Sequence, residues 1–170
     1  FPILGGNSAV TGAYSIDNSL RFNDGDSPRL TRSHSASAST FTYSTWVKRG
    51  TISNNYQYFF SYEDSGGSGA SGIAFHTSTD TLYYYNGASG IQQTTAVYRD
   101  VSAWYHILLK VTSNTGILYV NGVEVKTGIS VSSFTSGENM TLGVFKYGST
   151  LDFYFDGYMA ETYLIDGTAK

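Results

Sequence analysis

The chain has 170 residues, enough for one domain that buries about 70% of the surface exposed by its unfolded chain. It has no cysteine, which excludes disulfides and thiolate metal sites, and no apolar run approaches the length of a transmembrane helix. The net charge is −3 and the ten Lys and Arg are scattered, so we expect neither nucleic acid as a partner nor membrane insertion.

The first 18 residues have no regular pattern, and we expect an N-terminal arm or linker there. The chain starts without Met and without the basic region of a signal peptide, so we interpret it as a domain excised from, or the ordered part of, a longer protein. We expect residues 19–170 to form the folded domain.

Alternating patterns and turn residues predict a series of short strands. In chain order they cover residues 19–23, 29–32, 41–49, 56–62, 73–77, 82–85 and 91–98. After the hairpin described next, residues 140–146 and 153–165 are expected to close the chain as two further strands. No segment of useful length has a helical period, so the fold class is all-β.

The segment from Trp104 to Gly122 predicts a β-hairpin with little ambiguity. Residues 105–111 alternate in polarity, a polar turn follows at 113–116, and residues 117–120 form the return strand. Asn121-Gly122 suits a type I′ turn, since both residues tolerate a positive φ, and residues 123–126 turn straight back. Consecutive long strands of this kind imply a sizeable sheet buried against another layer.

Several segments together resemble a known family. They are Trp104-x-His106, the turn Leu118-Tyr119-Val120-Asn121-Gly122 and the closing run from Phe155 to Glu161. These resemble laminin-G-like domains of the concanavalin A-like jelly-roll superfamily. The resemblance implies an antiparallel two-sheet β-sandwich. It also implies that Trp46, Trp104 and Phe155 are core aromatics and that Glu161 satisfies donors inside the sandwich.

Three further segments are similar to versions found in tailed-phage virion proteins, especially tail fibres and related appendages. They are residues 19–23, 46–50 and 164–169. This similarity implies a location on the virion surface, with a host surface glycan or other virion subunits as partners and possible homo-oligomers. A structural or capsid-decoration role is the alternative to a lectin-like adhesion role.

Catalytic residues are not predicted. Glycoside hydrolysis requires a pair of carboxylates that converge on the scissile bond, whereas Glu63 and Asp64 are adjacent on a strand and point to opposite faces of the sheet. The three His residues have no nucleophile motif near them, and we interpret His106 as structural. We therefore expect no enzyme, with a glycoside hydrolase as the less favoured alternative.

A metal site is conceivable only at one turn. Asp24 and Asp26, in Asn23-Asp24-Gly25-Asp26, could contribute oxygen ligands to calcium, but the same residues are ordinary turn formers. We expect no other cofactor.

Glycan binding is the sharper hypothesis, because sugars stack on aromatic rings and tyrosine is amphipathic. If successive strands are antiparallel, the long loops at 63–71, 86–90, 113–115 and 127–139 share one end of the sandwich. The tight turns at 78–80 and 121–122 share the other. The candidate ligand-binding residues at the loop-rich end are Tyr62, Asp64, Tyr85, Asn86 and Asn114.

Overall fold

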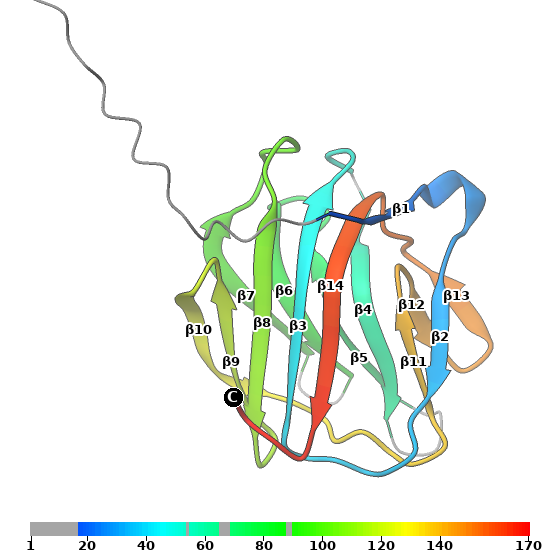
Figure 1. Cartoon of the computed structure of the whole chain (residues 1–170), viewed down its shortest axis with the longest axis vertical. Coiled ribbons are helices and arrows are strands. Elements are labelled where there is room, and N and C mark those ends of the chain that lie inside the picture. Colours follow the sequence, from blue (N-terminus) through cyan, green and yellow to red (C-terminus); the bar gives the residue numbers. More distant parts are fainter. Residues whose placement is uncertain (1–16, 54, 65–68, 88–89) are drawn as a thin grey trace, which may run out of the picture.

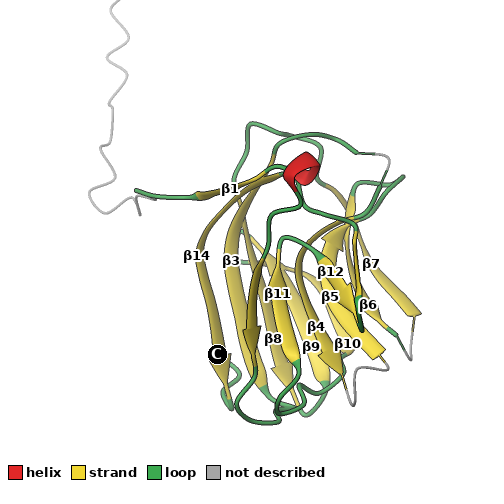
Figure 2. Ribbon diagram, turned by 90° about the vertical axis from the view of Figure 1, so that its right-hand side faces the viewer, coloured by secondary structure: helices red, strands yellow, loops and turns green. Residues whose placement is uncertain are grey.

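The computed structural model describes residues 17–170 except 54, 65–68 and 88–89. Most of the expected N-terminal arm therefore lies outside the described residues. The described chain forms two six-stranded antiparallel sheets that face each other, as Figures 1 and 2 show from two sides. The predicted all-β two-sheet sandwich is confirmed.

The order of strands in each sheet mixes distant parts of the chain. The first sheet runs β1 (Leu20–Phe22), β14 (Gly157–Asp166), β3 (Phe41–Arg49), β8 (Tyr105–Thr112), β9 (Thr115–Val120), β10 (Val123–Ser130). The second runs β2 (Leu30–Ser33), β11 (Asn139–Leu142), β4 (Gln57–Asp64), β5 (Gly69–Phe75), β6 (Thr81–Asn86), β7 (Gly90–Val97). A small separate hairpin joins β12 (Phe145–Tyr147) to β13 (Thr150–Asp152), and Asp24–Asp26 form a short 3-10 helix.

The core lies between the two sheets, where alternate residues of facing strands meet. Tyr43 of β3 stacks on Phe60 of β4 with ring centroids 4.0 Å apart, and Phe155 is fully buried beside Phe22 and Phe59. One continuous cluster of buried apolar residues includes members of both sheets. Aromatic side chains fill much of it, and each buries a large apolar area that stabilises the fold.

The predicted hairpin is confirmed in detail. β8 and β9 pair from Ile107↔Val120 to Thr112↔Thr115, and Asn121 and Gly122 have φ of 51° and 78°. Asn121 also accepts a hydrogen bond from the backbone N–H of His106 (2.8 Å), which fixes the turn on the start of β8. The local residue choice therefore dictated this element.

Other expectations about the second half of the chain were wrong. The strand expected at 140–146 is broken into β11 and β12 at Gly143, whose φ is 82° and whose position faces the ring of Phe22 too closely for a Cβ atom. The strand expected at 153–165 starts only at Gly157, after Phe153 takes a φ of 56°.

Three structural roles implied by the family resemblance also need correction. Trp46 is half-buried on the outer face of β3, where its ring lies 5.0 Å from that of His106, and Trp104 is half-buried just before β8. Glu161 is the extra residue of a bulge in β14, with φ 49°, and accepts a hydrogen bond from the exposed hydroxyl of Tyr163. None of the three lies inside the sandwich; of the aromatic residues, Phe155 alone takes the expected place.

Candidate ligand-binding face

A second aromatic cluster lies on the outer face of the second sheet. It comprises Tyr56, Tyr58, Tyr83, Tyr85, Phe145 and Phe153, and we call it the outer aromatic patch. Strand alternation explains it: Tyr84 and Leu82 face the core, so Tyr83 and Tyr85 face outward. A register shift between Tyr58 and Phe60 turns Tyr58 to the same outer face.

The centre of the patch is buried and its rim is partly open. Tyr58 and Tyr83 are each 2% exposed, and their hydroxyls are hydrogen-bonded to each other. Tyr56 and Tyr85 are half-buried around them. The Tyr56 ring lies 5.1 Å from that of Tyr83 and 5.2 Å, edge-on, from the imidazole of His76. The rim therefore offers aromatic surface next to hydroxyl and imidazole groups, which is what a sugar ring requires.

The β12–β13 hairpin forms one wall of the patch, seen at the right of Figure 1. Phe145 of β12 packs on Tyr58 and Tyr85, with centroids 4.5 and 5.7 Å apart. Its neighbour Lys146 donates to Glu63 (2.6 Å) and to the backbone oxygen of Gly148 (2.8 Å).

Glu63 is 3% exposed and also accepts from Asn139. Burial alone would raise the pKa of Glu63, but the hydrogen bonds from Lys146 and Asn139 outweigh it and hold the pKa below the ordinary value. Glu63 is therefore an ionised, fully engaged carboxylate. Such a group anchors the hairpin and is poorly suited to donate a proton to a glycosidic oxygen.

The predicted loop-rich end brings three of the five candidate residues together. Asn86 donates to the backbone oxygen of Ser130 (3.0 Å) and accepts from Ser132 (3.0 Å). Asn114 donates to the backbone oxygen of Val131 (2.8 Å). Tyr62 donates to the backbone oxygen of Ser132 (2.7 Å). All three therefore hold the segment that crosses from β10 to β11.

These contacts give the predicted ligand-binding residues a structural role within the fold. Tyr62 is 1% exposed and Asn86 3%, so both lie inside the molecule instead of flanking an open site. The side chain of Asp64 lies outside the described residues. Tyr85 alone, of the five, presents a partly open ring, and it does so on the outer aromatic patch.

The candidate calcium residues lie apart from this face. Asp24 and Asp26 are exposed in the 3-10 helix, and Asp26 accepts from Asn23 (2.6 Å) as in an ordinary turn. Across the described ranges, no group of three or more His, Asp or Glu side chains is arranged to hold a metal ion. Within those same ranges, no helix has the length and apolar character needed to span a membrane.

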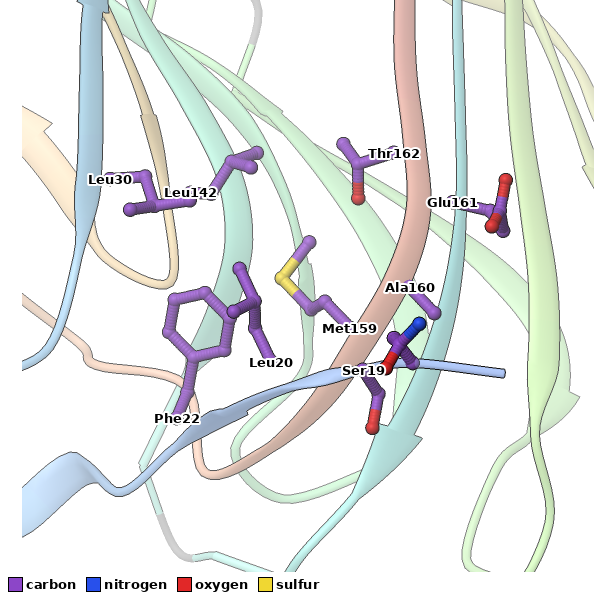
Figure 3. A pocket seen from close by; sticks show the side chains of 10 residues that line it. Ser19, Leu20, Phe22, Leu30, Leu142, Met159, Ala160, Glu161 and Thr162 are labelled. Atoms are coloured by element: carbon purple, nitrogen blue, oxygen red, sulfur yellow. The ribbon is translucent and has the colours of Figure 1, made fainter. Parts of the chain in front are cut away.

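A cavity of about 370 Å³ opens between the sheets where β1 and β14 face β2 and β11 (Figure 3). Its lining is mainly apolar, with Leu20, Phe22, Leu30, Leu142 and Met159, and Leu20 and Leu30 remain 54% and 49% exposed. Apolar walls offer a sugar few hydrogen-bonding partners, so we place the candidate site on the outer aromatic patch.

His106 has the structural role expected of it. Its Nε2 lies 2.9 Å from Oγ of Ser44 on the neighbouring strand, and burial lowers its pKa. It lies on the outer face of the first sheet, on the opposite side of the sandwich from the outer aromatic patch.

Comparison with known families agrees with this architecture. A family model described as the concanavalin A-like lectin/glucanases superfamily matches residues 22–169. The chain belongs to this superfamily. A search of curated proteins gave no match.

Solved structures with the same fold are distant in sequence. Mouse laminin α1 domains LG4-5 superpose with a TM-score of 0.66 at 11% identity, over 95% of this chain and 48% of that one. Domain 4 of the Geobacillus stearothermophilus arabinanase AbnA, in complex with arabinotriose, gives 0.64 at 19%, over 78% and 63%. The CBM40 of a Ruminococcus gnavus sialidase, bound to α2,3-sialyllactose, gives 0.58 at 14%, over 80% and 91%. These similarities establish the fold.

Sequence reasoning missed most of the patch. Tyr56, Tyr58, Phe145 and Phe153 were not predicted as site residues, because the face to which each side chain points depends on the bulge in β4 and on the break at Gly143. The run Tyr83-Tyr84-Tyr85 carried the available signal, since alternation requires that one face of β6 receives two of these rings.

Proposed function

We propose that this chain is a non-catalytic glycan-binding module whose ligand lies against the outer aromatic patch. We further propose that it acts on the surface of a tailed-phage virion and binds a host surface glycan. The observation that carries the first proposal is the pair of partly open tyrosine rings, Tyr56 and Tyr85, beside a hydroxyl-rich buried centre.

The superfamily supports this proposal. Two proteins with the same fold are described in complex with oligosaccharides, arabinotriose and α2,3-sialyllactose. The virion setting is supported only by the sequences of residues 19–23, 46–50 and 164–169, which are similar to segments of phage appendage proteins.

The engagement of Glu63 by Lys146 and Asn139 supports binding over catalysis, because a general acid must be free to give up a proton. A virion structural role is the second candidate. The observation that favours it is the apolar inter-sheet cavity with exposed Leu20 and Leu30, a surface that a neighbouring subunit could cover.

A glycan array followed by titration calorimetry tests the proposal. Tyr56→Ala and Tyr85→Ala are each expected to weaken binding about tenfold, equivalent to about 1.4 kcal/mol, because each removes a stacking surface. Running the array with calcium and with a chelator also tests whether a calcium site at Asp24 and Asp26 contributes to binding. We expect equal binding signals under the two conditions.

Tyr163→Ala is the matched control, since Tyr163 is 54% exposed on the other sheet and should not affect binding. A blank array, together with a stable oligomer in sedimentation, would replace the lectin proposal by the structural one. Release of oligosaccharides from host polysaccharide would contradict the non-catalytic assignment.

A further inference from the structure

The positive charges of this chain are distributed unevenly over its two sheets. All ten Lys and Arg lie among the described residues, so their positions are all known. Five lie with the first sheet, on β1, β3, β8, β10 and the C-terminal segment that bonds to β3: Arg21, Lys48, Lys110, Lys126 and Lys170. These residues are separated from the outer aromatic patch by the thickness of the sandwich.

Four of the remaining five basic residues either lie away from the outer aromatic patch or are bound to a carboxylate. Arg49 is 1% exposed inside the sandwich and binds Asp80. Arg99 shares this carboxylate at 2.7 Å, beyond the end of β7, and its side chain remains 64% exposed there. Arg29 and Arg32 belong to the β2 edge, two strands from β4, where Arg32 lines a cavity between the sheets.

Lys146 is therefore the cation beside the patch, and its charge is already compensated. Its ammonium group binds Glu63 at 2.6 Å and the Gly148 carbonyl at 2.8 Å. A ligand anion approaching this ammonium would also approach the Glu63 carboxylate, and the two interactions oppose each other.

The pKa values of the tyrosines at the centre of the patch agree with this charge distribution. Burial raises the pKa of both Tyr58 and Tyr83, and the neighbouring tyrosine hydroxyls raise that of Tyr58 further. The centre of the patch is thus uncharged, and the neighbouring Lys146 is already paired with Glu63.

We propose that the outer aromatic patch binds neutral oligosaccharides and discriminates against those carrying carboxylate or sulfate groups. This inference rests on the proposed glycan-binding function and specifies its ligand class. Hydroxyl groups of a neutral sugar suit the tyrosine and imidazole rim, whereas an acidic sugar would lose hydration without gaining a counter-ion.

Matched glycan pairs test the inference on the full chain. Binding to immobilised lactose is compared with binding to 3′-sialyllactose. For each glycan that binds on the array, the neutral form is likewise compared with its sulfated form. The neutral member is expected to bind at least tenfold more tightly at low salt, with an affinity that changes little between 50 and 500 mM salt. Gln93→Lys adds a cation on β7 opposite Tyr83 and should reduce the ratio of neutral to acidic glycan affinity. Tyr163→Lys, on the other sheet, should leave this ratio unchanged.

The outcomes separate the two proposals. Acidic members that bind as tightly as their neutral partners, or more tightly, would overturn the ligand class while leaving glycan binding intact. Absence of binding to every glycan would overturn the proposed function itself.

Discussion

At the residue scale, polar side chains near strand ends hold the end of β10 and the segment that follows it. Asn86 and Asn114 both hold the β10–β11 crossing, one from each sheet, and Gln92 adds a reciprocal pair of bonds with Ser130. A buried amide with several partners is a rigid structural element. The sequence correctly gathered these residues at one end, but their polar groups are used within the fold.

Asn86→Ala should therefore lower stability. The variant removes the hydrogen bonds that the buried Asn86 makes with the Ser130 carbonyl and the Ser132 hydroxyl, and losing the two costs about 1–3 kcal/mol in the free energy of unfolding. Urea denaturation measures this loss. Thr95→Ala, at an exposed position on β7, is the matched control and should change stability by less than about 0.5 kcal/mol. Unchanged stability with lost glycan binding would instead restore Asn86 as a ligand residue.

At the element scale, the predictable strands are those whose signals are local. β3 has the predicted bounds Phe41–Arg49, and the β8–β9 hairpin has alternation and turn residues within 20 positions. β11, β12 and the start of β14 depend instead on contacts distant in sequence, such as Gly143 against Phe22. The outer aromatic patch takes Tyr58, Tyr83 and Tyr85 from the predicted strands β4 and β6, but Phe145 from β12 and Phe153 from the segment before β14. Its full composition therefore could not be inferred.

A buried charge cluster links the two sheets at the end opposite the loops. Arg49 of β3 binds Asp80, the Tyr98 carbonyl (2.9 Å) and Gln57 of β4 (3.0 Å), with its guanidinium 4.6 Å from the Phe75 ring. Burial alone would raise the pKa of Asp80, but hydrogen bonds from Arg99 and Arg49 outweigh it and lower the pKa. The contribution of this carboxylate to stability is therefore fully present above the unfolded-state pKa of about 3.9.

Stability should consequently fall as the pH drops below about 4, because the unfolded chain then takes up protons that the folded Asp80 resists. Asp80→Asn should flatten this acid limb and, at neutral pH, cost about 3–5 kcal/mol, since it leaves the buried Arg49 unpaired. Arg99→Gln removes only the exposed partner of Asp80. It should shift the acid side of the stability curve and cost less free energy of unfolding at neutral pH than Asp80→Asn. Denaturant midpoints at pH 7, 5, 4 and 3 measure both effects; an acid limb identical in all three proteins would contradict the assignment.

At the scale of the whole molecule, the two sheets share one core, although each combines strands from distant parts of the chain. The continuous buried cluster draws on β3, β8 and β9 from one sheet and on β4, β5 and β6 from the other. Neither sheet can keep its inner face covered without its partner. The outer aromatic patch lies outside this core, so a ligand face can vary in composition while the sandwich is maintained.

This shared core predicts cooperative unfolding. Trp46 and Trp104 both belong to the first sheet or its immediate approach, so tryptophan fluorescence reports that sheet, whereas far-UV circular dichroism reports both. The two probes should give coincident urea transitions, because exposing the inner face of one sheet exposes that of the other. Tyr163→Trp adds a further reporter on β14 of the first sheet and should follow the same curve. Fluorescence that changes well before the dichroism would show that the first sheet detaches independently, and would contradict a single cooperative core.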